Sequence, residues 1–226
     1  MFDTNVVEDF HLLKALGLPT YDAYLLPCSE FMEKYAWFKK HFVHTHYYLN
    51  LLPNEAGFRK LSLVGFGDLD EARSFISCHL HRSYQNYMLR VSEFESNLYG
   101  GSVMSESDVV LAELSPGLQQ EVANGAVPVV GVTLTSYASC AKYTTDDSFE
   151  RTLLWRAIEA IMVRERADAM MPATASLVHE CRRHWFIKGY FEFAYTQASE
   201  DGPLRLVFFD VKFGPAYYNV QVTGPS

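Results

Sequence analysis

Apolar residues recur along the chain with two different periods, and together these periods predict a mixture of helices and strands. Spacing typical of amphipathic helices, with apolar residues three or four positions apart, occurs in residues 5–19, 29–42, 67–80, 149–166 and 174–186. Apolar runs of strand length occur in residues 44–52, 60–66, 87–95, 107–114 and 126–138, and twice within 189–214. Because several strands follow one another without a helix between them, we expect antiparallel pairing and an α+β fold.

The order of these segments predicts two parts of unequal size. We expect a smaller N-terminal lobe over residues 1–87 and a larger lobe over residues 88–226. Ser29 is the expected cap of its helix, and Asp68 with Glu71 three residues later forms a capping-box-like start. The glycine-bearing stretch at residues 96–106, SNLYGGSVMSE, is expected to be a connection with a Gly-Gly turn.

The most apolar hairpin of the chain carries an acid in each of its strands. Glu192 lies in FEF and Asp210 in FFD. A buried carboxylate is costly unless it is paired, hydrogen-bonded or bound to a cation, so one interpretation is a metal site. The other is a hairpin whose acids face water, because alternation puts Phe191 and Phe193 on the face opposite Glu192. The pattern alone leaves both open.

Composition narrows the classes of function. The chain has 226 residues, 49% of them hydrophobic, and a formal net charge of −8. It has no Lys/Arg run of the kind that binds nucleic acid, and no stretch approaches the roughly 20 apolar residues of a membrane span. Its N-terminus lacks a signal-peptide pattern. We therefore expect a cytoplasmic protein that binds neither nucleic acid nor a membrane. Its four scattered cysteines predict no disulfide framework.

Two histidine patterns are candidates for zinc sites. His44 and His46 lie two apart on a strand-like run, so they share a face and could bind a metal, although a surface junction that contains histidines is more common. His179 and His184, in HECRRH, are five apart. The zinc-protease motif needs histidines four apart on one helical face, so this pattern does not match it.

Residues 89–128 resemble the nucleotide-binding core of ATP-grasp proteins, and in particular the branch at the front of phosphoenolpyruvate synthase and pyruvate phosphate dikinase. The shared features are a strand that ends in an acidic hinge (SEFE), a glycine-bearing turn (YGGSVM), a strand that ends in Glu113, a GLGE-like element at residues 117–120 (GLQQ), and Gly125. The two acid-bearing strands of residues 189–214 follow in the same order. The resemblance covers roughly residues 88–215.

The resemblance implies two α+β lobes with mainly antiparallel sheets around a cleft that holds Mg-ATP. Glu192 and Asp210 would then bind Mg²⁺, which takes one or two carboxylates plus phosphate oxygens. Lys212 would contact a phosphate, and Gly100 and Gly101 would let backbone N–H groups approach the phosphates. The residues implied for the rest of the nucleotide, adenine and ribose included, are Ser92, Glu93, Phe94, Glu95 and Glu113.

The chain also departs from this pattern. Gln120 stands where the family has the glutamate of GLGE, and D-V-K stands where this branch commonly has Q-x-R. The cation that the first lobe supplies to the phosphates is assigned to Arg59, with Lys60 and Arg90 as alternatives. The phosphohistidine and carbon-substrate domains of the dikinases have no counterpart in these 226 residues, so full dikinase chemistry is not expected in this chain alone.

Three functions follow from these patterns. The leading hypothesis is an ATP-dependent ligase or phosphotransferase that acts on a carboxylate or another phosphoacceptor, either a small molecule or a protein. The alternative is a degenerate ATP-grasp-like binding or regulatory module without catalysis. A third is an α+β interaction protein without a nucleotide site, in which the two acids lie far apart or in open solvent. Whether the chain is an enzyme, and whether it forms a homo-oligomer, stays open at this point.

Overall fold

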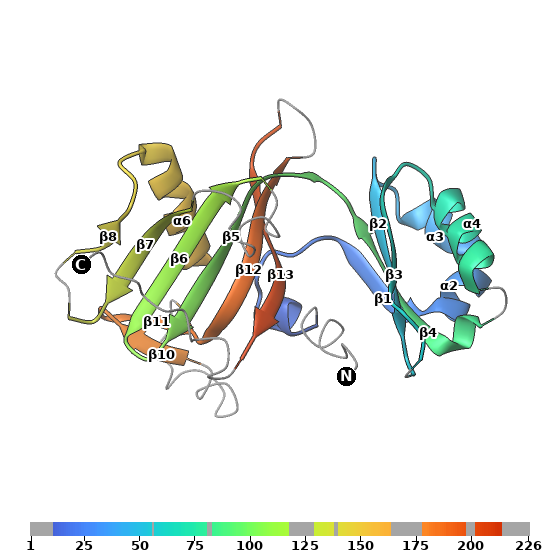
Figure 1. The fold of residues 1–226 in the computed structure, drawn as a ribbon, viewed down its shortest axis with the longest axis horizontal. Helices are drawn as coiled ribbons and strands as arrows, with labels where there is room; N and C mark the ends of the chain where they lie inside the picture. The colour runs from blue at the N-terminus through green and yellow to red at the C-terminus, as the bar shows by residue number, and fades with distance from the viewer. Residues whose placement is uncertain are drawn as a thin grey trace. The chain divides into compact units, whose positions relative to one another are not determined.

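The computed structural model describes residues 11–55, 57–80, 83–117, 129–137, 140–163, 178–197 and 202–213. Among these, residues 21–96 pack into one compact unit, called unit 1, and residues 11–20 and 97–213 pack into another, called unit 2 (Figure 1). The described chain therefore passes between the units at Thr20–Tyr21 and at Ser96–Asn97. The expected division after residue 87 differs from this partition, because it falls inside a strand of unit 1.

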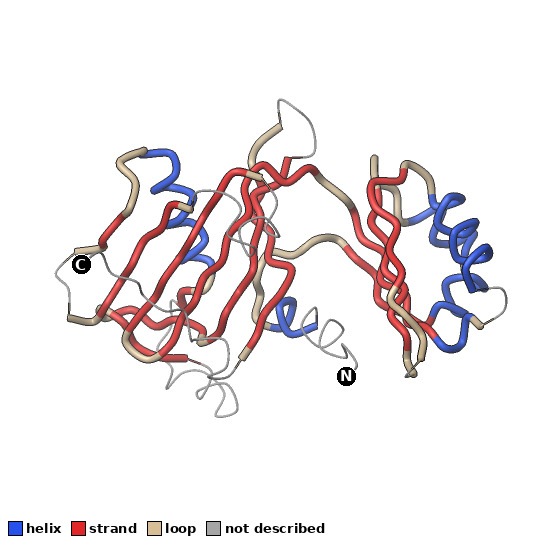
Figure 2. The backbone as a smooth tube through the Cα atoms, viewed as in Figure 1, coloured by secondary structure: helices blue, strands red, loops and turns tan. Residues whose placement is uncertain are grey.

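Unit 1 is an antiparallel four-stranded sheet with helices on one face (Figures 1 and 2). The sheet order is β1-β4-β2-β3, with β1 at Ala23–Pro27, β4 at Tyr87–Glu93, β2 at Tyr47–Pro53 and β3 at Leu61–Phe66. The helices are α2 (Cys28–Glu33), α3 (Tyr35–His41) and α4 (Leu69–Leu80), and the 3₁₀ turn η1 spans Tyr84–Asn86. Strand residues and helix residues meet in one apolar core that includes Phe31, Phe38, Ile76, Leu49 and Val91.

In unit 1 the start of α4 lies where the sequence predicts it, whereas the helix expected over 29–42 differs from the structure. The single helix expected over 29–42 is two helices, because the chain leaves helical geometry at Lys34 (φ −94°, ψ 15°). Ser29 is not a cap, since α2 already begins at Cys28. The capping-box start of α4 is confirmed, because the Asp68 carboxylate accepts the N–H of Asp70 at 2.9 Å. Glu71 reaches back to Gly67 N at 3.2 Å.

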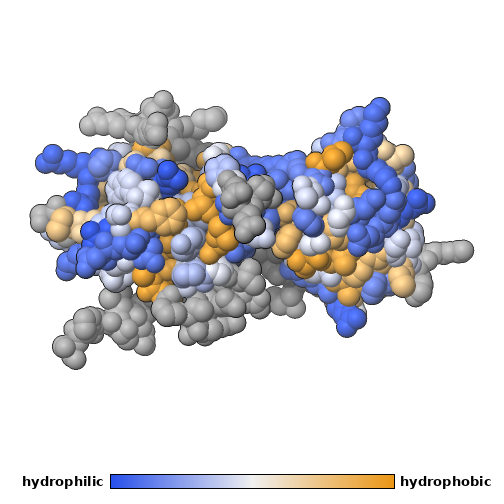
Figure 3. Space-filling model, turned by 90° about the horizontal axis from the view of Figure 1, so that it is seen from above, coloured by the Kyte–Doolittle hydropathy of each residue, from blue (hydrophilic) through white to orange (hydrophobic). Residues whose placement is uncertain are grey.

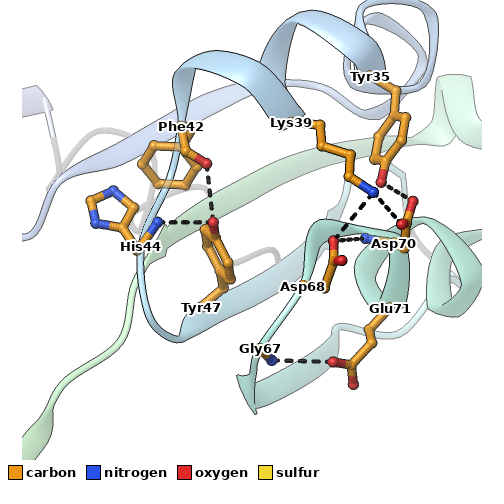
Figure 4. A network of polar contacts seen from close by, with 9 residues as sticks. All are labelled: Tyr35, Lys39, Phe42, His44, Tyr47, Gly67, Asp68, Asp70 and Glu71. Atoms are coloured by element: carbon orange, nitrogen blue, oxygen red, sulfur yellow. Dashed lines mark hydrogen bonds and ion pairs between the residues drawn. The ribbon is translucent and has the colours of Figure 1, made fainter.

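A polar cluster fastens α3 to the start of α4 (Figure 4). The Lys39 ammonium pairs with the carboxylates of Asp70 and Asp68, the latter at 3.8 Å, and the Tyr35 hydroxyl donates to Asp70. The Lys39 contact, followed by that of Tyr35, lowers the pKa of Asp70. Each of the four side chains that join these two helices therefore contacts another member of the cluster.

Unit 2 is built on a six-stranded antiparallel sheet of order β13-β12-β5-β6-β7-β8. The strands are β5 (Ser96–Glu106), β6 (Val109–Pro116), β7 (Val130–Thr135), β8 (Lys142–Tyr143), β12 (Gly189–Gln197) and β13 (Arg205–Lys212). Helix α6 (Ser148–Ala160) and a small sheet of β9 (Met162–Val163), β10 (Val178–Cys181) and β11 (His184–Ile187) share one apolar core with one face of this sheet. The α+β class with mainly antiparallel sheets is confirmed.

Three expectations for unit 2 are wrong. Residues 96–106 are strand β5 rather than a connection. The helix expected over 149–166 ends at Ala160, where the chain enters β9. The helix expected over 174–186 is a hairpin in its described part, with a turn at Arg182 and Arg183, whose φ angles are +50° and +66°. For residues 96–106 the glycine pair suggested a turn, whereas for the other two segments helical spacing extended into short runs that tertiary packing places in strands.

Among the described residues, no helix combines the length and the apolar composition that crossing a membrane requires. Several large hydrophobic side chains are exposed, including Val43 and Tyr137 at 70% and 88%. On the face of the molecule seen in Figure 3, hydrophobic and hydrophilic residues are interspersed. Single exposed apolar side chains of this kind are normal on a protein surface.

A buried hydrogen bond joins the β10–β11 hairpin to the main sheet of unit 2. Ser105 Oγ lies 2.6 Å from His179 Nε2, and both side chains are buried. A second contact joins the Cys181 thiol to the carbonyl of Asp108 at 3.4 Å. Burial lowers the pKa of His179, so the folded state favours the neutral imidazole.

We expect unit 2 to lose stability as the pH falls from 7 to 5. The pKa of His179 in the folded state lies below the value of about 6.5 in the unfolded chain, so the unfolded chain takes up a proton first. The contribution to stability is thus complete above about pH 6.5 and is lost as the pH falls toward the folded pKa. Urea unfolding across this range should show a shallower pH dependence in His179→Gln than in the unaltered chain. His79→Gln, which replaces an exposed histidine on α4 of unit 1, is the control. Equal slopes in His179→Gln and the unaltered chain would refute this assignment.

Candidate functional site

One face of the unit 2 sheet is apolar and buried, and the other carries a group of polar side chains. Strand alternation turns Phe191, Val103 and Val211 into the core. Their neighbours along the strands therefore point to the opposite side. We call this side the polar face, defined by Ser102, Glu113, Tyr190, Glu192, Asp210 and Lys212.

Glu192 and Asp210 lie directly opposite each other on the neighbouring strands β12 and β13. A β-bulge makes this possible. Phe193 pairs with Phe208 in the core, while Glu192 pairs with Asp210, so Phe209 is an extra residue on β13. If Phe209 instead took an ordinary position in the strand, alternation would place Asp210 on the same face as Phe208, pointing into the core. The two acids are half-buried rather than surrounded by solvent.

Lys212 adds a cation to the pair of acids. Its ammonium lies 2.8 Å from the Asp210 carboxylate, and the two side chains are 32% and 23% exposed. Lys212 is also opposite Tyr190 in the strand register. Two carboxylates and an ammonium thus lie within one small patch of the sheet. Asp210 and Lys212, two residues apart on β13, therefore share a face of the sheet.

Glu113 and Tyr190 extend this patch across β5 and β6. Glu113 lies opposite Ser102, and burial raises its pKa. Burial likewise raises the pKa of Tyr190, and the neighbouring Glu192 carboxylate raises it further. A hydrogen bond with Ser102 and the Lys212 charge act on Tyr190 in the opposite direction. The ionisable groups of the polar face are therefore close enough to influence one another.

Gly100 and Gly101 lie inside β5 rather than in a turn, so the expected Gly-Gly turn is wrong. They pair with Ser115 and Leu114 of β6. A Cβ atom at Gly101 would lie 2.3 Å from the carbonyl oxygen of Glu113 and 2.4 Å from the Phe193 ring. Glycine is needed here because β6 and β12 approach this point of β5 too closely for a side chain. Its predicted contact with phosphate stays a prediction.

The remaining predicted residues belong to unit 1 or lie outside the described part of the chain. Ser92 and Glu93 end β4, and Phe94 and Glu95 follow before the chain leaves unit 1. Arg59 is exposed in the connection between β2 and β3. Gln120, like Gly125 and most of the GLGE-like element, lies outside the described residues. The structure thus brings together Glu113, Glu192, Asp210 and Lys212 of the predicted set.

No group of three or more His, Cys, Asp or Glu residues suited to holding a metal ion occurs in the described ranges. His44 contacts carboxylates, while His46 is exposed, so the pair that was weighed as a zinc site does not converge. Magnesium is less demanding, because one or two carboxylates suffice when phosphates and water complete the shell. The donor set of Glu192 and Asp210 fits that requirement. The hypothesis that these acids lie far apart or in open solvent is wrong.

Sequence reasoning missed two members of the polar face, Ser102 and Tyr190. Tyr190 precedes Glu192 by two residues, so strand alternation could have placed both on one face. Ser102 could be found only from its register with Glu113, which depends on residues 96–106 being a strand.

No protein-family model and no curated protein matches the sequence. Among solved structures, the chain is similar to D-alanyl-alanine synthetase A from Vibrio cholerae, with 12% identity, a TM-score of 0.42, and coverage of 92% of this chain and 54% of that one. It is also similar to N5-carboxyaminoimidazole ribonucleotide synthetase in its ADP complex, with 11% identity, a TM-score of 0.43, and coverage of 93% and 44%. For a RiPP-associated ATP-grasp ligase from Chryseobacterium gregarium, in complex with ADP and a leader and core peptide, identity is 9%, the TM-score 0.43 and coverage 93% and 51%.

The chain spans about half the length of the solved structures that it matches. These matches are synthetases and ligases rather than phosphoenolpyruvate synthase or pyruvate phosphate dikinase, so they do not support a nearer likeness to that branch. At this level of similarity they say nothing about substrate or activity. The functional argument therefore rests on the polar face.

Proposed function

We propose that this chain binds Mg-ATP on the polar face of unit 2 and works as an ATP-grasp-like ligase or phosphotransferase. The observation that supports this proposal is the direct pairing of Glu192 with Asp210, with Lys212 beside them. Hard oxygen ligands on adjacent strands suit Mg²⁺, and an ammonium beside them suits a phosphate. The proposal includes a cytoplasmic location.

Each residue of the polar face has a distinct role in this proposal. Glu192 and Asp210 would hold the metal, which would neutralise phosphate charge, and Lys212 would exchange its contact with Asp210 for one with a phosphate. Glu113 and the Gly100–Gly101 segment line the adjoining part of the face. Phosphoryl transfer needs charge neutralisation and positioning more than covalent help from the protein, so no nucleophilic side chain is required.

We assign the remaining contacts to segments predicted from the sequence. The backbone and side chains of residues 92–95 contact adenine and ribose, and Arg59 or a neighbouring cation reaches the phosphates. Gln120 is assigned to the same site. The acceptor is a carboxylate or another phosphoacceptor, on a small molecule or a protein. The branch of the family stays a prediction from the order of motifs in residues 88–215.

A second candidate function is a binding or regulatory module that has lost catalysis. The ion pair between Lys212 and Asp210 favours it, because a cation already contacts one of the two acids. Gln120 in place of the family glutamate points the same way. This module would hold its fold without turning over nucleotide.

Calorimetric titration of ATP into the purified chain, with and without Mg²⁺, tests the proposal. We expect binding that strengthens at least about tenfold when Mg²⁺ is present, because the metal joins two carboxylates to the phosphates. An enzyme should also release ADP or phosphate once an acceptor is supplied, and a degenerate module should not. Absence of binding under both conditions would refute the proposed function.

A further inference from the structure

A second group of charged side chains lies in unit 1, next to the two points where the chain enters and leaves it. Asp22 follows the passage at Thr20–Tyr21 and immediately precedes β1. Glu93 ends β4, three residues before the passage at Ser96–Asn97. Neither residue belongs to the polar face.

These two residues are hydrogen-bonded to each other twice. The N–H of Glu93 donates to the carbonyl of Asp22 at 2.9 Å. The N–H of Asp22 donates to the Glu93 carboxylate at 2.7 Å. The incoming and outgoing segments of the chain are therefore joined side by side, and one of the two bonds depends on a side chain.

The imidazole of His44 lies between the two carboxylates. Its Nε2 is 3.1 Å from Asp22 Oδ2, and its Nδ1 is 3.7 Å from Glu93 Oε2. The Glu93 side chain is only 11% exposed and that of His44 22%, whereas that of Asp22 is 57% exposed. The contact with Asp22 is within hydrogen-bond distance, whereas the longer contact with Glu93 is electrostatic.

The loop that carries His44 is itself held firmly (Figure 4). The N–H of His44 donates to the Tyr47 hydroxyl at 2.9 Å, and that hydroxyl donates to the carbonyl of Phe42 at 3.1 Å. The ring of His44 packs edge-on against Phe42, with centroids 4.5 Å apart. Two residues on, the carbonyl of His46 accepts the N–H of Phe94 at 2.9 Å. The loop thus contacts residues next to both passages of the chain.

We propose that His44 is a positioning residue that clamps the two segments joining unit 1 to unit 2. With Asp22 and Glu93 it fixes the direction in which both segments leave the sheet of unit 1. The Glu93 carboxylate serves this clamp, so contacts with nucleotide from residues 92–95 come from the backbone and from the other side chains. The effect on nucleotide affinity rests on the proposed function, whereas the clamp itself does not.

Amide hydrogen exchange of the nucleotide-free chain tests the clamp independently of ATP. In His44→Ala we expect exchange at the Asp22, Glu93 and Phe94 amides to rise roughly tenfold, the effect of losing a hydrogen bond to a charged group. The Leu51 amide, in the core strand β2, should be unchanged. His46→Ala removes an exposed imidazole two residues away and is the matched control. Asp22→Asn is a second variant that perturbs the same contact from an exposed position.

Unchanged exchange at Asp22 and Glu93 in both His44→Ala and Asp22→Asn would overturn the clamp. So would an equal rise at Leu51, which would indicate general loss of stability, or an equal rise in His46→Ala. The affinity for Mg-ATP should fall roughly three- to tenfold in His44→Ala, as expected for a lost positioning contact. Faster local exchange in a chain that never binds ATP would support the clamp and refute the proposed function, so the two are separable.

Discussion

Replacing Asp210 by Asn should lower the Mg²⁺-dependent affinity for ATP by about 100-fold or more. Substitutions that only orient metal ligands typically cost roughly 10–100-fold, and Asp210 is assigned to the metal directly. The change keeps the size of the side chain and removes its charge. Calorimetric titration of the variant, with and without Mg²⁺, measures the effect.

The control for this experiment is Glu180→Gln, which neutralises an exposed acid elsewhere in unit 2. It should leave the affinity within about twofold of the unaltered value, because a single exposed charge contributes little at physiological salt. Far-ultraviolet circular dichroism should show that both variants keep the fold, since Asp210 is half-buried on the polar face. Full Mg²⁺-dependent affinity in Asp210→Asn would contradict the assignment of this carboxylate.

Replacing Gly101 by Ala should destabilise the chain by about 3 kcal/mol or more, at the upper end of the cost of overpacking. The added Cβ would meet a carbonyl oxygen of β6 at 2.3 Å and the Phe193 ring at 2.4 Å. The ring can rotate only into a packed core, and the carbonyl belongs to the sheet backbone. The free energy of unfolding, measured with urea, should show the loss.

Gly67→Ala is the matched control for this prediction. A Cβ there comes no closer to another atom than 4.0 Å, at the Glu71 carboxylate. Its effect should stay within about 0.5–1 kcal/mol, the range of changes that touch no packed feature. Comparable losses in the two variants would mean that the close approach at Gly101 relaxes at little cost.

Much of the fold could be predicted because local signals and packing agree. Glu192 and the aromatics of residues 190–193 alternate clearly, and the structure forms the expected hairpin there. The capping signal of Asp68 and Glu71 likewise marks the start of α4. In both places the local sequence signal is clear and agrees with the structure.

Other parts could not be predicted, because the deciding contact comes from elsewhere in the chain. Residues 96–106 contain a glycine pair, which is typical of turns, yet Gly101 is required by the approach of Phe193 and β6. The 174–186 segment fits helical spacing, but its described part packs as a hairpin that places Cys181 and Phe186 in the core. Long-range packing overrode a local preference in each case.

The candidate site, too, could be predicted from the sequence only in part. The register that pairs Glu192 with Asp210 depends on a bulge at Phe209, and no sequence signal marks a bulge within a run of aromatics. The two acids could be identified from the sequence, because carboxylates are rare in so apolar a hairpin. The structure added Ser102 and Tyr190, which are uncharged and were therefore not singled out in the sequence.

The most direct test of the central claim is to locate a metal–nucleotide complex on the polar face. Mn²⁺ replaces Mg²⁺ at oxygen-ligand sites, and its unpaired electrons broaden nearby nuclear magnetic resonance signals. With a non-hydrolysable ATP analogue and Mn²⁺, we expect the amide signals of Glu192 and Asp210 to disappear while that of Leu154, in α6 on the core side of the sheet, persists. Saturated nucleotide binding with the Glu192 and Asp210 signals intact would contradict the assignment of the metal to these acids.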